Sequence, residues 1–130
     1  MFSYNPNDTT VTIDGIFITG MGEDMITFEF QEERFSPMVG AQGDVVVNET
    51  NNQLADMEIT VLISSPQYGM MLDYARKQTT FPVWGVNKSV GERFGGTKAR
   101  FKNTAPVSYG TEAEARTFSI TVFDGVHETA

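Results

Sequence analysis

Alternation of apolar and polar residues is the clearest pattern along this chain. Residues 25–35, 56–64 and 116–123 each place apolar side chains at nearly every second position. A period of two predicts β-strands with one face on a core and the other on water. The apolar series, which we expect to form the core, comprises Ile26, Phe28, Phe30, Met57, Ile59, Val61, Ile63, Phe118, Ile120 and Val122.

Weaker patterns predict further strands between and before these segments. Residues 10–18 begin with the same alternation and contain Asp14-Gly15, which favours a bulge or a tight turn. Residues 81–86 read as a strand in which Pro82 indicates a sheet edge or a strand start. The Gly-rich residues 87–102 are expected to be partly β.

One short helix is expected at about residues 66–77. Tyr68, Met71, Leu72 and Ala75 follow the spacing of a single helical face. Ser64, with Gln67 three residues later, is typical of a capping box at a helix start. The apolar face is expected to pack on the sheet.

These elements predict one domain over residues 1–130, since no linker or repeat divides the chain. Six or seven strands with one helix indicate a mainly β fold, a β-sandwich or barrel-like arrangement with a helix appended. Residues 39–54 are Gly- and Asn-rich apart from a short Val run, and we expect a long polar loop there. Loops of more than about 12 residues are usually functional or mobile.

Charge is unevenly distributed in this acidic protein, whose formal net charge is −8. Residues 1–75 carry twelve acidic side chains against the single base Arg34. Residues 76–102 form a basic segment with seven bases against Glu92. The overall charge disfavours a protein that grips nucleic acid. The basic segment is either a solvated face or a surface that meets an acidic region of another copy.

Catalytic and metal-binding patterns are missing from the sequence. Cysteine is absent and His127 is the single histidine, which excludes disulfides, thiolate catalysis and multi-histidine metal sites. Residues 91–98 superficially resemble a phosphate-binding loop, but Thr97 precedes Lys98, the reverse of the required order. We therefore expect no enzyme, cofactor or metal, and neither a signal peptide nor a membrane span.

Several short stretches, in this order and spacing, resemble the tail tube proteins of contractile-tailed bacteriophages, a small family of phage structural proteins. They are Val11-Thr12-Ile13-Asp14-Gly15, Ile18-Thr19-Gly20, Val39-Gly40-Ala41-Gln42-Gly43-Asp44, Ser64-Ser65-Pro66-Gln67, Phe81-Pro82-Val83, Gly95-Gly96 and Glu112-Ala113-Glu114-Ala115-Arg116-Thr117-Phe118.

The resemblance implies a structural subunit of the virion tail, made in the cytoplasm of a bacterial host. Such subunits form homohexameric rings that stack into a tube inside a contractile sheath, and their inner sheets close into one barrel. The implied partners are other copies of the chain and the sheath, baseplate and tail-terminator proteins. DNA passes through the lumen during genome ejection without specific binding.

Dimensions agree with this expectation. Four inner strands from each of six subunits give a barrel of about 24 strands and about 48 Å backbone diameter. Side chains leave a bore of roughly 35–40 Å, wide enough for a duplex of about 20 Å. A wet bore needs a polar lining. Candidate lumen-facing residues are Thr27, Glu29, Gln31, Glu33, Glu58, Thr60, Thr117, Ser119 and Thr121.

The remaining candidate residues concern contacts between subunits. The long loop is expected to reach an adjacent ring through Gln42, Asp44, Asn48, Glu49, Asn51 and Asn52. The basic segment is expected away from the bore, on ring or sheath contacts, through Arg76, Lys77, Lys88, Arg93, Lys98, Arg100 and Lys102.

Two alternatives remain open. A related secretion or pyocin-like injection particle has the same tube physics with a different cargo. A monomeric β-sandwich module for sugar or peptide predicts a platform of exposed aromatic residues, with Tyr68, Trp84 and Tyr109 as candidates.

Overall fold

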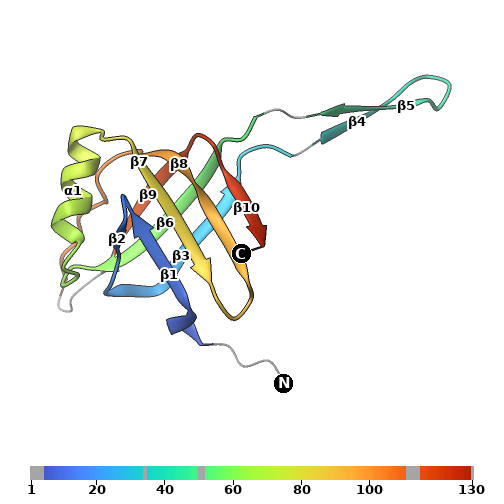
Figure 1. The fold of residues 1–130 in the computed structure, drawn as a ribbon. Coiled ribbons are helices and arrows are strands. Elements are labelled where there is room, and N and C mark those ends of the chain that lie inside the picture. The colour runs from blue at the N-terminus through green and yellow to red at the C-terminus, as the bar shows by residue number, and fades with distance from the viewer. Residues whose placement is uncertain (1–4, 34, 50–51, 111–114, 130) are drawn as a thin grey trace.

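Ten strands, one α-helix and one short 3-10 helix make up the described part of the chain (Figure 1). The computed structural model describes residues 5–33, 35–49, 52–110 and 115–129. The elements are η1 (Pro6–Asp8), β1 (Thr9–Ile13), β2 (Ile16–Phe17), β3 (Met21–Phe30), β4 (Phe35–Val39), β5 (Val45–Glu49), β6 (Ala55–Leu62), α1 (Tyr68–Lys77), β7 (Phe81–Asn87), β8 (Glu92–Phe101), β9 (Ala115–Val122) and β10 (Val126–Thr129). The predictions of a mainly β fold and of one short helix are confirmed.

Eight of the strands belong to one antiparallel sheet. Its order is β2-β1-β7-β8-β9-β6-β3, with β10 paired to β8 beside this path. Figure 1 shows the sheet folded over on itself, so that β1, β7 and β8 lie in front of β3, β6 and β9. Strands β2 and β3 are the two ends of the path, so the sheet makes a sandwich-like shell and no closed barrel within the described residues.

The core fills the space between the two halves of the sheet. In β6 and β9 every second residue is buried, as the alternation predicts. Met57, Ile59, Val61, Phe118, Ile120 and Val122 are fully buried, while Ile26, Phe28 and Phe30 pack against them and are partly exposed. Three phenylalanine rings line the core, with 5.0 Å between the centroids of Phe81 and Phe101 and 5.3 Å between those of Phe101 and Phe118.

Strand β8 changes partner in its middle, which is where the sheet folds over. Its first half pairs with β10, where Gly95 faces Val126, and its second half pairs with β9, where Ala99 faces Val122. Gly95 lies between the two halves with φ 138°, a backbone conformation that side chains disfavour. Asp124, in the turn from β9 to β10, accepts from the backbone N–H groups of Thr97 and Lys98 at 3.2 and 3.0 Å.

The Asp124 carboxylate is expected to stabilise the fold in a pH-dependent way. Burial raises the pKa of Asp124, but hydrogen bonds from the Thr97 hydroxyl and from backbone N–H groups outweigh it, and the net pKa lies below its usual value. A lowered carboxyl pKa stabilises the fold above the unfolded value of about 3.9, and this stabilisation is lost as pH falls through the folded pKa.

We expect Asp124→Asn to lower the free energy of unfolding by about 1–2 kcal/mol at pH 7. The difference from wild type should shrink as pH falls below about 4, since the wild-type carboxyl then takes up a proton. Urea unfolding at pH 7 and near pH 2.5 measures both values, and an unchanged difference would contradict this role.

Helix α1 begins at Tyr68, two residues later than predicted, and without the expected capping box. Gln67 occupies the N-cap position but makes no side-chain cap hydrogen bond. Its Oε1 instead accepts from the backbone N–H and the hydroxyl of Thr19, each at 2.9 Å. Ser65 is buried and donates to the Thr19 carbonyl at 2.6 Å. The polar residues thus join the helix start to the segment before β3.

Two turn and edge predictions have different outcomes. Asp14-Gly15 forms the tight turn between β1 and β2, with φ 53° and 79°. Strand β7 is interior, since it pairs with β1 and β8, so the alternative of a sheet edge is wrong. Pro82 is accommodated as the second residue of the strand, where the β7–β8 register shifts between Phe81 and Val83.

Part of the expected loop at 39–54 is folded as an arm. Within the described ranges, strands β4 and β5 pair only with each other, from Phe35 opposite Glu49 to Val39 opposite Val45. Figure 1 shows this hairpin projecting far from the sandwich. An isolated two-stranded hairpin is marginally stable in water, so the arm is well suited to gain stability by contacting another molecule.

Candidate functional site

A polar face covers the outer side of β3, β6 and β9. The strand registers place Thr27 opposite Glu58 and Glu58 opposite Ser119, so that three strands contribute to each row of side chains. Eight of the nine predicted lumen-facing residues lie on or directly beside this face. They are Thr27, Glu29, Gln31, Glu58, Thr60, Thr117, Ser119 and Thr121. Glu33 is exposed beyond the end of β3.

Asp56 is the centre of a small polar network on this face. Its Oδ1 accepts from Gln31 Nε2 at 3.0 Å and lies 2.9 Å from Lys102 Nζ. Burial raises the pKa of Asp56, but the hydrogen bonds from Lys102 and Gln31 lower it by more than burial raises it. The net pKa is therefore below its usual value. The carboxylate is therefore ionised at neutral pH. Further along β6 and β9, on the same face, the Thr60 and Thr117 hydroxyl oxygens are 3.1 Å apart.

Three bases of the basic segment also lie on the polar face, where we did not expect them. Ala99 and Phe101 are buried, so the alternating Lys98, Arg100 and Lys102 point outward. Arg100 faces Thr121 across the β8–β9 pair, and the Lys102 backbone N–H donates to the Ser119 carbonyl at 2.9 Å. The face is therefore acidic on β3 and β6 and basic on β8.

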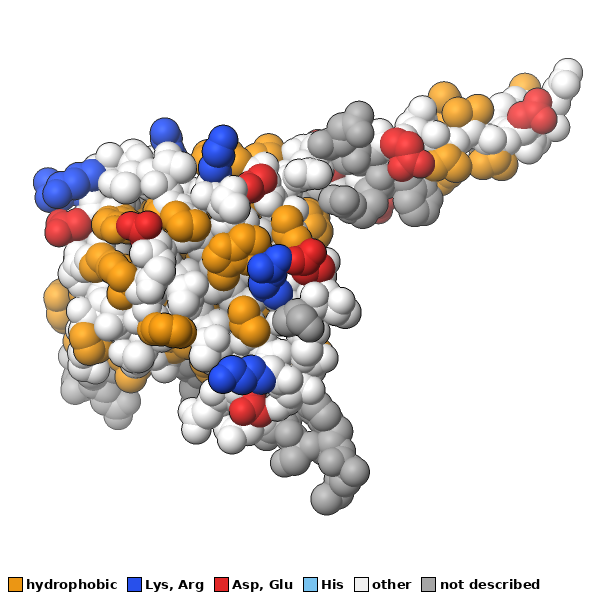
Figure 2. Space-filling model, viewed as in Figure 1, with side chains coloured by type: hydrophobic (Ala, Val, Ile, Leu, Met, Phe, Trp, Pro, Cys, Tyr) orange, Lys and Arg blue, Asp and Glu red, His pale blue; other side chains and the backbone are white. Residues whose placement is uncertain are grey.

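The other four bases do not extend this group. Arg76 and Lys77 are in the last turn of α1. Lys88 directly follows the C-terminal end of β7. The Arg93 guanidinium stacks on Trp84, 4.5 Å from the centroid of its ring. Figure 2 shows the basic side chains visible on that side of the molecule in separate groups rather than in one patch.

The hairpin arm carries four of the predicted inter-ring residues and an apolar face that the prediction did not include. Gln42, Asp44, Asn48 and Glu49 are exposed on it, Asn52 follows it, and Asn51 lies outside the described residues. Val39, Val45 and Val47 share one side of the hairpin and are 67%, 62% and 52% exposed. Figure 2 shows apolar side chains along the arm. The run Val45-Val46-Val47 was the available signal in the sequence.

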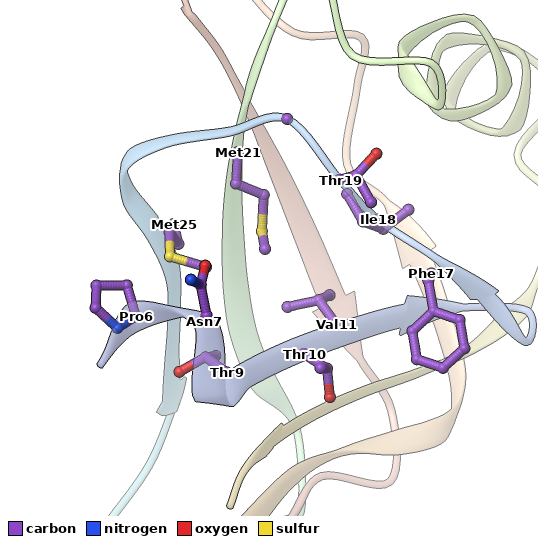
Figure 3. A pocket seen from close by; sticks show the side chains of 11 residues that line it. Pro6, Asn7, Thr9, Thr10, Val11, Phe17, Ile18, Thr19, Met21 and Met25 are labelled. Carbon is purple, nitrogen blue, oxygen red and sulfur yellow. The ribbon is translucent and has the colours of Figure 1, made fainter. Parts of the chain in front are cut away.

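A groove of about 550 Å³ lies between β1, β2 and the beginning of β3 (Figure 3). Val11, Ile18, Met21 and Met25 line it, and Phe17 stands at its rim with 63% of its surface exposed. None of the lining residues whose side chains the structure describes is ionisable. It was not predicted, although all its described lining residues lie between Pro6 and Met25, because the alternation of apolar and polar residues does not show how this stretch folds back on itself.

The expected aromatic platform is not formed. Tyr68 packs on Phe118 in the core, with 5.9 Å between ring centroids. Trp84 lies on β7, in the other half of the sheet, and Tyr109 lies in the connection before β9, 81% exposed. Tyr68 and Tyr109 both interact with Arg116, whereas Trp84 lies in the other half of the sheet, so the three rings do not form one binding surface.

Arg116 is a buried cation that binds the connection before β9 to the sandwich. It is 1% exposed, its Nη1 donates to the Ser108 carbonyl at 2.8 Å, and its guanidinium is 5.0 Å from the Tyr109 ring centroid. Interaction with the Tyr68 hydroxyl raises the pKa of Arg116, so it stays charged. The hydrogen bond to the Ser108 carbonyl holds the backbone of this connection against the sandwich.

A metal site, a phosphate-binding loop and a membrane-spanning helix can each be checked against the described residues. No group of three or more His, Cys, Asp or Glu is arranged to hold a metal ion among the described residues. Residues 91–98 form a turn and the first part of β8 rather than a strand-to-helix loop. No described helix has the length and apolar character required to cross a bilayer.

Comparison with known proteins places the fold. No family model matches the chain, and no curated protein matches it. Among the solved structures that are similar, three match over nearly the whole chain. One is the anti-feeding prophage cap, a tube-terminating cap, with a TM-score of 0.65 and 11% identity over 100% of this chain and 93% of that one.

The other two belong to PVC, an extracellular contractile injection system, in its extended state. A chain of the sheath–tube complex matches with a TM-score of 0.68 and 7% identity over 99% of this chain and 93% of that one. A chain of the sheath/tube terminator matches with a TM-score of 0.65 and 7% identity over 99% of both chains. At these identities the likeness shows a shared fold, one found in tube-associated assemblies of contractile particles.

Proposed function

We propose that this protein is a structural subunit of the tube of a contractile-tailed bacteriophage, where it forms stacked hexameric rings inside a sheath. The fold shared with chains of a sheath–tube complex and of tube caps supports a structural role of this kind. The subunit would act without catalysis, in the tail of the virion. Its partners would be further copies of itself and the sheath, baseplate and tail-terminator proteins.

The observation that carries the proposal is the two-sided character of four neighbouring strands. β8, β9, β6 and β3 are consecutive in the sheet, with an apolar inner side and a polar outer side. Four strands per subunit is the number that gives a hexameric barrel a bore of roughly 35–40 Å. The outer side of these strands would line the bore and face the DNA.

The charges on this face refine how DNA would pass. Acidic Glu29, Asp56 and Glu58 lie on β3 and β6, and Asp56 is paired with Lys102. A wall of mixed charge offers phosphates no large counterion release, so DNA would slide without being held. Screening limits the field of unpaired charges to about 8–10 Å.

The hairpin arm would join adjacent rings. Its predicted polar contact residues flank the exposed apolar face of Val39, Val45 and Val47. Burial of this face against the next ring would stabilise the hairpin and the stack together.

A second candidate is a tube-terminating cap in a phage or in a related injection particle. A tube-terminating cap and a sheath/tube terminator are among the similar structures, which favours it. A cap forms one ring on the end of a tube, whereas a tube subunit adds rings without limit. Genes for terminase and capsid near the gene of this protein would indicate a phage, and a secretion or lysis cassette would indicate an injection particle.

Negative-stain microscopy of the purified protein over a range of concentrations tests the proposal. We expect hollow tubes, or rings that stack as concentration rises. Rings that never stack but bind the end of a pre-formed tube would favour the cap. A strictly monomeric protein, also unable to form tubes with a sheath or baseplate partner, would contradict both.

A further inference from the structure

The polar face has opposite charges at its two sides. Strand β3 at the end of the sheet presents Glu29, and its neighbour β6 presents Glu58. Strand β8, at the other side of these four strands, presents Lys98 and Arg100. The strand between, β9, presents only the hydroxyl groups of Thr117, Ser119 and Thr121. The face is thus a charge dipole across the strands.

Within the part of the chain that the structure describes, the charges at the two sides of the face form no ion pair. Among the described residues, Glu29, Glu58 and Lys98 form no side-chain ion pair, and Arg100 donates only to the Thr80 hydroxyl at 2.8 Å. Lys102, in contrast, reaches past Ser119 to Asp56. The remaining acidic side chains of this face, on β3 and β6, and its remaining basic side chains, on β8, are therefore available to pair with opposite charges on another molecule.

We propose that neighbouring copies in a ring meet through these two sides, with Glu29 of one copy beside Lys98 and Arg100 of the next. The inference rests on the proposed function, because it concerns the lateral contact in the same ring. A cyclic arrangement brings one side of each copy against the opposite side of its neighbour, so that acid faces base at every contact.

The charge pattern also disfavours a two-fold dimer, the competing arrangement. A two-fold dimer through β3 would place Glu29 of one copy near the acidic side of the other, and a dimer through β8 would place bases together. Like charges at such contacts are repulsive. Among the described strands, β3 pairs only with β6, so one long side of it is an open edge. An open edge joins readily to another chain, and charge polarity directs this tendency toward rings.

Paired charge-reversal variants test this contact. Glu29→Lys alone and the double variant Lys98→Glu with Arg100→Glu should each raise the protein concentration needed for rings at least tenfold. One exposed ion pair contributes little, but reversal makes every lateral contact in the ring repulsive. An equal mixture of the two variants should form rings again, because alternating copies restore acid beside base at each contact.

Controls separate this inference from the proposed function. Asp73→Lys makes the same charge change as Glu29→Lys at an exposed position of α1, away from the polar face, and should leave ring formation unchanged. Rings in wild type and in both reversal variants would overturn the lateral contact alone, as would failure of the mixture of folded variants. Absence of rings in wild type would overturn the proposed function. If thermal melting shows that a reversal variant does not fold, Glu29→Gln and Arg100→Gln replace it. These neutral variants should raise the protein concentration needed for rings by a smaller factor. An unchanged concentration would contradict the contact.

Discussion

Gly95→Ala is expected to lower the free energy of unfolding by more than about 3 kcal/mol and to prevent stable folding at 37 °C. A Cβ at this position would lie 2.1 Å from the Val83 carbonyl oxygen and 3.0 Å from the Trp84 Cα. Both atoms belong to the backbone of β7, which is paired on both sides and cannot move away. The φ of 138° adds strain for any side chain. Urea denaturation or thermal melting of the purified variant measures the loss.

Gly91→Ala is the matched control for this substitution. Gly91 also has a positive φ, 76°, but a Cβ there would meet nothing within 4 Å. We expect a loss of about 1–2 kcal/mol from the backbone conformation alone. Equal losses in the two variants would show that the close approach of the β7 backbone is not what requires a glycine at position 95. A much larger loss at Gly95 would support its role where the sheet folds over.

The strands of the core were predictable because their pattern is local. In residues 56–62, each buried position follows from its neighbours, and Met57, Ile59 and Val61 are buried as expected. The tight turn at Asp14-Gly15 was likewise one of two outcomes that its residue types allow. The fold-over at Gly95 was not predictable, since the reason for this glycine lies in β7, a strand contributed by another part of the chain.

The candidate site was predictable in part for the same reason. Alternation placed Thr27, Glu58 and Ser119 on the polar sides of their strands, and the registers then brought them side by side. The position of Lys102 beside Asp56 was missed, because it depends on the register between β8 and β9. The helix start was misassigned because Gln67 binds Thr19, 48 residues away, instead of its own backbone.

The arm shows a different limit of sequence reasoning. A run of valines predicts burial, yet Val45 and Val47 are more than half exposed in the isolated chain. These valines can be buried only when another molecule covers the arm. Val45→Glu is therefore expected to leave the fold unchanged and to raise the concentration needed for ring stacking at least tenfold. Loss of one buried Val side chain, about 1.5–3 kcal/mol, accounts for a change of this size before any cost of burying the charge.

Val107→Glu is the matched control for Val45→Glu. Val107 is 68% exposed, in the connection before β9, and the substitution makes the same chemical change away from the arm. Both variants should melt within a few degrees of wild type, since neither side chain is in the core. Sedimentation and microscopy over a concentration series then measure assembly. Stacking by Val45→Glu at the wild-type concentration would mean that the apolar face of the arm does not join the rings, whereas an equal loss in both variants would point to net charge. A selective loss in Val45→Glu would assign the exposed valines to the contact between rings.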